Sequence, residues 1–196
     1  MFQQIIRPAA MLLVVMTVLT GVIYPLVVTG IAQVVFPTQA NGSLIHEGDQ
    51  LVGSTLIGQP FDDAKYFWSR PSATGPSPYN AGASSGSNLG ANEPNLISAV
   101  KDRIETLKKA DPTNELPIPV DLVTASASGL DPDISPAAAE YQAARVAKAR
   151  GLSEQQVRAL IEPSTEARQL GLLGEPRVNV LSLNRALDGL TTKNGP

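Results

Sequence analysis

The stretch that decides the architecture is AAMLLVVMTVLTGVIYPLVVTGIAQVVF, residues 9–36. Between Arg7 and Glu47 the chain has no charged side chain, apart from any charge that His46 carries. As an α-helix the stretch would rise about 42 Å, which exceeds the roughly 30 Å hydrocarbon core of a bilayer. The sequence therefore predicts one transmembrane helix over residues 9–36, preceded by a short segment, residues 1–8.

The distribution of charge predicts how this helix is oriented. Arg7 and the α-amino group precede it, whereas the following segment has acidic residues but no Lys or Arg before Lys65. Basic residues that flank a membrane helix are enriched on the cytoplasmic side. We therefore expect residues 1–8 to be cytoplasmic and residues 37–196 to form a periplasmic or extracellular domain.

A cleaved signal peptide is the main alternative to an anchor. Gly30, Ile31 and Ala32 form a small-x-small sequence of the kind that signal peptidases cut. A typical hydrophobic region of a signal peptide has about 7 to 15 residues, and this run is nearly twice that length. The expected form is therefore the uncleaved anchor, which the intact mass of the membrane-extracted protein would verify.

Three residues inside the predicted helix suggest a contact within the membrane. Thr17, Gly21 and Pro25 follow one another at intervals of four and so share one side of the helix. Small residues on one side let a second helix approach closely in lipid. This strip is predicted to pack against a partner helix, although Gly and Pro are also commoner in membrane helices generally.

Composition limits the functions open to the rest of the chain. All 18 acidic residues follow His46, whereas one of the 15 basic residues, Arg7, precedes it. The exported part is therefore acidic, and no nucleic-acid partner is expected. The chain has no cysteine, so this part must be stabilised by packing or by a partner rather than by disulfides.

Beyond the helix, the apolar pattern and its breakers predict one mixed α/β (α+β) domain. Its predicted strands are residues 51–57, 66–68, 120–125 and 177–181. Its predicted helices begin at the cap Asn92 with Pro94 in the first turn, at Ser135 with a stop at Gly151, at the capping box of Ser153 and Gln156, and near Leu183. Residues 71–92 form a polar, glycine-rich loop that is too long for a simple turn.

The residues that most catalytic and metal sites need are scarce. His46 is the single histidine and cysteine is absent, so neither a His/Cys metal site nor a Ser-His-Asp or Cys-His centre is expected. An acid pair is the remaining possibility, with Asp121, Asp131 and Asp133 best placed. Asp131 precedes Pro132, however, and this dipeptide is typical of a turn. We therefore expect no catalytic residue and no bound metal.

The glycine-rich loop has a pattern that phosphate-binding loops share. Gly82, Gly86 and Gly90 recur every four residues, which could present backbone amides to an anion. No Gly-Lys-Ser/Thr follows them, so a nucleotide cradle is the weaker interpretation. A flexible loop, or one that docks onto a partner, is preferred.

Arg145, Lys148 and Arg150 form a basic cluster near the end of the helix predicted after Ser135. Cations at a helix C-terminus offset the helix dipole, so a solvated helix end is expected. The stretch also has the length of a DNA-binding helix-turn-helix. The acidic charge and the outward orientation of the domain disfavour that alternative.

Four segments of the chain are distinctive. They are YFWSRPSA at 66–73, GSNLG at 86–90, PVDLVTASASGLDPDISPAAAEYQAARVAKARGL at 119–152 and GEPRVNVLSLNRAL at 174–187. Together they resemble the KdpC family, and the resemblance covers the whole chain in order and spacing. It departs at Asp133, where family members often carry His, and at Ala127, where they often carry Gly.

The resemblance implies a non-catalytic accessory subunit of the high-affinity potassium-transporting P-type ATPase of the bacterial cell (inner) membrane. Its implied partners are the potassium pore subunit, the P-type ATPase subunit and a small stabilising subunit. Such a subunit assembles the pump and acts as a catalytic chaperone that raises ATP affinity. Because ATP is cytoplasmic and the domain is expected outside, an indirect effect through subunit contacts is favoured.

Two sets of site residues follow from the resembling segments. If this chain contacts ATP directly, the candidates are Ser126, Ser128 and Gln142. The candidates for docking onto partner subunits are Tyr66, Trp68, Arg70, Asn88, Asp131 and Arg177. Two other functions stay open: a membrane-anchored periplasmic ligand-binding or scaffolding domain unrelated to a pump, and a hydrolase, which the missing His/Cys groups disfavour.

Overall fold

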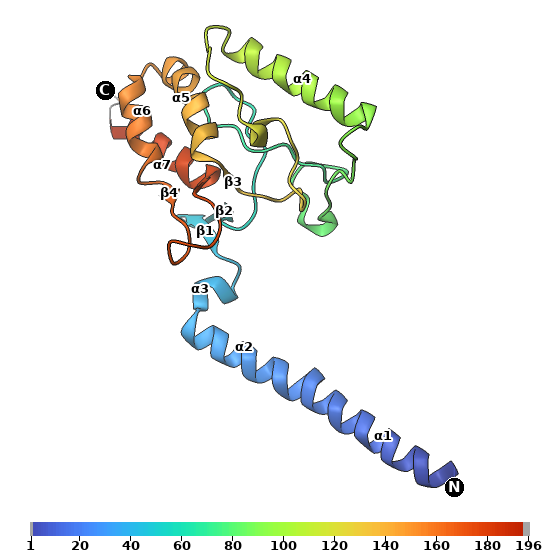
Figure 1. Ribbon diagram of the computed structural model, residues 1–196. Helices are drawn as coiled ribbons and strands as arrows, with labels where there is room; N and C mark the ends of the chain where they lie inside the picture. Colours follow the sequence, from blue (N-terminus) through green and yellow to red (C-terminus); the bar gives the residue numbers. More distant parts are fainter. Residues whose placement is uncertain (1, 194–196) are drawn as a thin grey trace. The chain divides into compact units, whose positions relative to one another are not determined.

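The computed structural model of the chain describes residues 2–193 (Figure 1). Contacts within the chain separate an N-terminal unit, Met1–Gly53, from a C-terminal unit, Ser54–Pro196. The N-terminal unit contains the apolar helix and a short hairpin. The C-terminal unit contains a mixed α/β domain, and the chain thus has the N-terminal apolar helix and the mixed α/β domain that the sequence predicts.

The apolar helix runs through three consecutive segments. They are α1 (Phe2–Val18), the π-helical turn η1 (Leu19–Ile23) and α2 (Tyr24–Val35). Within residues 2–193, one helix, Gln4–Val35, is long and apolar enough to cross a membrane, and its most apolar part is 0% buried. A fully exposed apolar helix is what a lipid environment or partner helices would cover.

The π-helical turn has a local cause. Pro25 has no backbone N–H, and its ring crowds the carbonyl four residues earlier. The turn before it widens, so that the Tyr24 N–H bonds the Leu19 carbonyl five residues back. Thr20 Oγ1 donates to the Met16 carbonyl at 2.7 Å, which uses one carbonyl of the same stretch.

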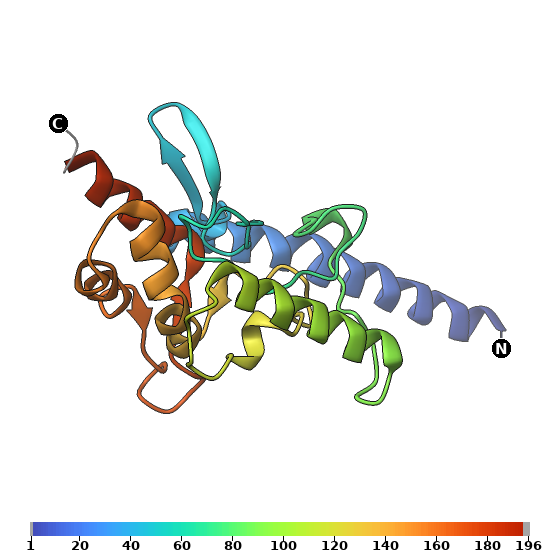
Figure 2. The ribbon, with the colours of Figure 1, turned by 90° about the horizontal axis from the view of Figure 1, so that it is seen from above.

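A short helix and a hairpin complete the N-terminal unit. They are α3 (Pro37–Ala40), β1 (Leu44–Glu47) and β2 (Gln50–Ser54), and Figure 2 shows the hairpin in pale blue and cyan. The strand predicted at 51–57 ends early, at Ser54. The hydroxyl of Ser54 accepts the backbone N–H of Leu56 at 3.1 Å and so stabilises a turn in place of the strand.

The C-terminal unit is built around α5 (Pro136–Arg150). Four alanines of α5 are at most 2% exposed, and their small side chains let other elements pack close. These elements are α6 (Glu154–Ile161) and the strand β5 (Arg177–Asn179). Both contact α7 (Val180–Lys193), and β5 is the central strand of a sheet of order β3 (Asp133–Ile134), β5, β4 (Thr165–Glu166). The strands are antiparallel, with Ile134 and Thr165 both opposite Val178.

The predicted signals at the ends of α5 and α6 are confirmed. Ser135 Oγ accepts the Ala138 N–H at 3.0 Å, and Gly151 ends the helix with a φ of 66°. The side chains of Ser153 and Gln156 form the capping box of α6. The helix α4 (Pro94–Ala110) starts after the cap residue Glu93, one residue later than predicted.

Two predicted strands are wrong. Residues 66–68 pair with no strand, because Tyr66 lies in a bend and side chains of α5 and α7 bind the backbone groups of Phe67 and Trp68. Residues 120–125 instead start with the 3-10 turn η3 (Val120–Leu122), in which the Leu122 N–H bonds the Pro119 carbonyl at 3.1 Å. The short strand β5 stops at Asn179 because its side chain accepts the Ser182 N–H at 3.0 Å and thereby caps α7.

Candidate functional site

The predicted docking residues Arg70, Asp131 and Arg177 line one groove of about 500 Å³. Arg70 directly precedes the glycine-rich loop, Asp131 lies shortly before β3, and Arg177 lies on β5. Residues far apart in the sequence thus meet beside β3 and β5, the latter being the central strand of the sheet. The groove is therefore the best candidate for a docking site, because three of the predicted docking residues line it.

Arg70 and Asp131 form the first ion pair of the groove. Arg70 Nη1 lies 2.8 Å from Asp131 Oδ2, and both side chains are about a quarter exposed. Asp131 Oδ1 also accepts the Asp133 backbone N–H at 3.0 Å, as expected for an aspartate before proline. Among the described residues, Arg70 Nε is buried without a hydrogen-bond partner.

Asp133 forms the centre of a second ion-pair network. Arg177 Nε lies 3.0 Å from its Oδ2, and Asn179 Nδ2 donates to its Oδ1 at 3.2 Å. Arg177 Nη2 also pairs with Glu166 Oε2 at 2.6 Å. Burial raises the pKa of the Asp133 carboxyl, and the negative charges of Asp131 and Glu166 raise it further. The hydrogen bond from Asn179 and the positive charge of Arg177 lower it.

This arrangement suits recognition better than catalysis. The charged groups alternate in sign and are held by one another, which gives a fixed pattern for a polar partner surface. In the described range, no group of three His, Cys, Asp or Glu residues could hold a metal ion. The third candidate acid, Asp121, binds the Ser135 backbone N–H at 2.7 Å and so supports the start of α5.

Two buried side-chain amides bind the backbone of Phe67 and Trp68, in the segment 64–68. Gln142 on α5 accepts the Trp68 N–H at 2.8 Å and donates to the Trp68 carbonyl at 3.2 Å. Asn184 on α7 binds both backbone groups of Phe67 in the same way. Gln142, predicted as a nucleotide contact, is 1% exposed, and its amide is occupied by these partners.

Arg145 binds the same segment with its guanidinium group. Its Nη1 donates to the Ala64 carbonyl at 2.6 Å and its Nη2 to the Tyr66 carbonyl at 3.1 Å. The group also lies 4.2 Å from the centre of the Trp68 ring. Burial lowers the pKa of Arg145 to about 10, although the negative charge of Asp111 acts to raise it.

The basic cluster predicted as a solvated helix end is therefore mostly buried. Arg145 is 6% exposed, and the Arg150 side chain is also 6% exposed, pairs with Asp188 at 2.7 Å and stacks on Tyr66. Lys148 is exposed, as predicted. The two arginines bind carbonyls and rings of the 64–68 segment, which sequence spacing along α5 does not reveal.

The other nucleotide candidates have structural partners too. Ser126 Oγ accepts the Gly129 N–H at 2.9 Å, and Ser128 Oγ accepts the Leu130 N–H at 3.1 Å. Both hydroxyls hold the turn at residues 126–130, against which the glycine-rich loop packs. The docking candidate Asn88 lies exposed on that loop with a φ of 52°.

Side-chain hydrogen bonds hold the glycine-rich loop. Ser72 Oγ donates to the Gly129 carbonyl at 2.6 Å and accepts the Tyr79 N–H at 3.0 Å. A Cβ at Gly86 would lie 2.8 Å from the Ala127 carbonyl oxygen, so this glycine permits close backbone approach. Burial raises the pKa of Tyr79, which donates to the Arg70 carbonyl, to about 12.

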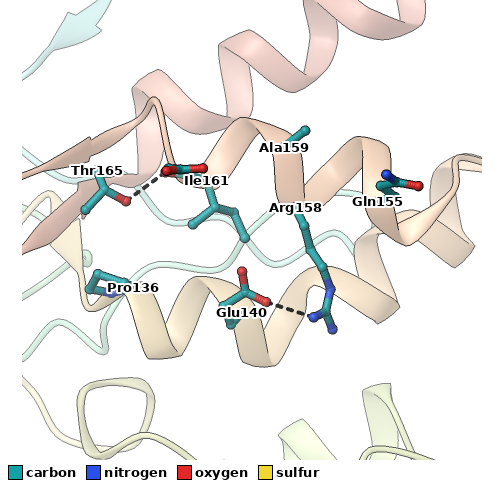
Figure 3. A pocket seen from close by; sticks show the side chains of 8 residues that line it. Pro136, Glu140, Gln155, Arg158, Ala159, Ile161 and Thr165 are labelled. Carbon is teal, nitrogen blue, oxygen red and sulfur yellow. Dashed lines mark hydrogen bonds and ion pairs between the residues drawn. The ribbon is translucent and has the colours of Figure 1, made fainter.

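A second groove, of about 620 Å³, lies along α5 and α6 (Figure 3). Figure 3 shows Arg158 on α6 directed at Glu140 on α5, and their charged groups are 3.2 Å apart. Pro136 and Ile161 supply apolar surface beside this pair. No predicted site residue lines this groove.

Sequence reasoning missed an exposed group of leucines between β4 and β5. Leu170, Leu172 and Leu173 are 90%, 81% and 60% exposed. Their signal in the sequence is the apolar run QLGLLG, set between Arg168 and Glu175 in an otherwise polar stretch.

Comparison with known proteins supports the resemblance. The family model KdpC, described as K+-transporting ATPase, c chain, matches residues 6–189. The Potassium-transporting ATPase KdpC subunit of Polynucleobacter asymbioticus is 63% identical over 187 residues, which cover 95% of this chain and 99% of that protein. Those of Herpetosiphon aurantiacus (66% identity, 93% and 94% covered) and Polaromonas naphthalenivorans (62% identity, 99% of each covered) are similar along their whole length. The chain thus belongs to the KdpC family of potassium-transporting ATPase subunits.

Proposed function

We propose that this chain is a non-catalytic accessory subunit that holds the pore and ATPase subunits of a potassium pump together from the outer side of the membrane. The exposed apolar helix carries this proposal, because it needs lipid or partner helices around it. The names of the relatives supply the complex, a potassium-transporting ATPase. The groove between Arg70 and Arg177 supplies a polar surface for a partner.

The proposed orientation places residues 1–8 in the cytoplasm and the C-terminal unit outside. The natural absence of cysteine allows a clean test. Single cysteines would replace Gln4 and Ala91, which are both exposed, and intact cells would be treated with a membrane-impermeant maleimide. We expect labelling at Ala91→Cys in intact cells and at Gln4→Cys only after permeabilisation; the reverse pattern contradicts the proposal.

The proposed effect on ATP hydrolysis is indirect. ATP is cytoplasmic, and in this orientation a few N-terminal residues alone share its compartment. Contacts that favour one conformation of the ATPase subunit would change its apparent ATP affinity without touching the nucleotide. The hydroxyl and amide partners of Ser126, Ser128 and Gln142 support this route over direct contact.

Purification from gently solubilised membranes tests the assembly role. The tagged chain should retain a multi-span pore protein and a P-type ATPase in stoichiometric amounts, and its deletion should abolish their joint recovery. A chain purified alone would instead favour the alternative, an anchored ligand-binding or scaffolding domain.

A further inference from the structure

The segment between β4 and β5, residues 167–176, places apolar side chains in an exposed position. In Figure 2 it is the orange loop that projects from the rest of the C-terminal unit. Leu170, Leu172 and Leu173 at its tip, called the leucine knob below, are 90%, 81% and 60% exposed. Single exposed apolar residues are common, but a contiguous group on a projecting loop marks an interaction surface.

The leucine knob is held in one conformation. Gln169 and Leu173 exchange backbone hydrogen bonds of 2.9 Å in both directions across its base. Leu170 and Gly171, at the centre of the turn, have φ values of 54° and 72°. A left-handed φ is unfavourable for leucine, so the hydrogen bonds at the base maintain a strained and exposed side chain. A preorganised knob loses little conformational freedom on binding.

The charges beside the knob are paired. Within the loop Arg168 and Glu175 lie 2.5 Å apart, and on the flanking strands Arg177 of β5 and Glu166 of β4 lie 2.6 Å apart. The loop therefore has no free cation to attract anionic lipid headgroups. It also lacks Trp and Tyr, the residues enriched at membrane interfaces. These features favour an apolar pocket of a protein over a lipid surface.

We propose that the leucine knob inserts into an apolar pocket on the outer face of another subunit of the potassium-transporting ATPase. This inference rests on the proposed function and adds the part of the chain that makes the apolar contact. The groove of Arg70 and Arg177 would supply polar recognition, whereas the knob would supply burial of apolar surface, which is the larger source of affinity.

The test uses the full chain, expressed together with the other subunits of the pump. A photoreactive phenylalanine analogue replaces Leu172 in one variant and the exposed Leu116 in a control. A second pair of variants compares Leu170→Ser/Leu172→Ser/Leu173→Ser with Leu116→Ser/Ile97→Ser, which alters exposed residues elsewhere. Thermal unfolding checks that each variant is folded.

Irradiation should join position 172, but not position 116, to a pump subunit identified by mass spectrometry. The amount of the other subunits that co-purifies with the triple variant should be lower than with the control variant by about tenfold or more. The photo-adduct needs no change at Leu170 or Leu173, so it remains decisive if the triple variant unfolds.

Two results would overturn the inference and leave the proposed function standing. One is equal recovery of the pump subunits by the folded triple variant and the control. The other is a photo-adduct on lipid alone, which would assign the knob to the bilayer. If the unaltered chain retains no pump subunit, the proposed function fails and the inference fails with it.

Discussion

Asn184 on α7 accepts a hydrogen bond from the Phe67 backbone N–H at 2.8 Å and donates one to the Phe67 carbonyl at 3.0 Å. The amide thereby satisfies both polar groups of a residue that is 0% exposed and lies 117 positions away in the sequence. A side chain thus binds the backbone groups that a neighbouring strand would bind in a sheet.

Asn184→Leu should destabilise the C-terminal unit by roughly 2 to 4 kcal/mol, because both backbone groups of Phe67 would be buried without a partner. Chemical denaturation of the full chain in detergent, followed by the single tryptophan, Trp68, measures this change. The matched control is Asn95→Leu on the exposed side of α4, expected to change stability by less than about 0.5 kcal/mol. Equal effects of the two substitutions would contradict the role of Asn184.

Arg145→Lys should also destabilise this unit, by roughly 1 to 3 kcal/mol. A single ammonium cannot reach the carbonyls of both Ala64 and Tyr66 or stack on Trp68 as the planar guanidinium does. Lys148→Arg, at an exposed position of the same helix, is the control. Denaturation midpoints that shift alike for both variants would show that the buried contacts of Arg145 add no stability.

The carboxyl of Asp133 should titrate above 3.8, its ordinary pKa, because burial disfavours the charged form. Between 3.8 and the raised pKa, the folded state binds more protons at this group than the unfolded state. The contribution of Asp133 to stability therefore falls as pH rises through that window. Carbon-13 NMR of the carboxyl groups gives the midpoint directly.

Arg177→Gln sharpens the pH prediction, because it removes a cation that lowers the pKa of Asp133. The midpoint of Asp133 should move further up, whereas that of Asp63 should stay low. The pKa of Asp63 is lowered mainly by the backbone N–H of Lys65, a contact that Arg177 does not share. A midpoint of Asp133 at or below 3.8, or one that Arg177→Gln leaves in place, would be inconsistent with the buried network.

The helices could be predicted because their signals are local. Ser135 caps α5 by binding Ala138, and Ser153 and Gln156 cap α6, so each signal and its partner lie within one turn. The apolar helix was predictable for the same reason, since its length and composition are read from one continuous stretch.

The failed predictions depend on partners that are distant in the sequence. Residues 66–68 have the apolar pattern of a strand, but whether they pair with a strand or with side chains depends on α5 and α7. Arg145 looked solvated because its acceptors at Ala64 and Tyr66 lie about 80 positions away. The ion-pair network depends on the register of β3 and β5, and strands this short give almost no periodic signal.

Gly21→Leu should weaken the association of this chain with the pump without disturbing its own helix. A Cβ at Gly21 would meet only Thr17 Cγ2, at 4.0 Å, so the helix has room for a side chain, whereas a closely packed partner helix would not. Gly30→Leu is the control, since Gly30 is equally open and, at about 100° per residue, lies on roughly the opposite side of the helix. Recovery of the other subunits in mild detergent should fall severalfold for Gly21→Leu and stay near normal for Gly30→Leu. Because both substitutions increase hydrophobicity equally, a loss common to both would indicate altered membrane insertion, and normal recovery of both would show that the small-residue strip makes no subunit contact.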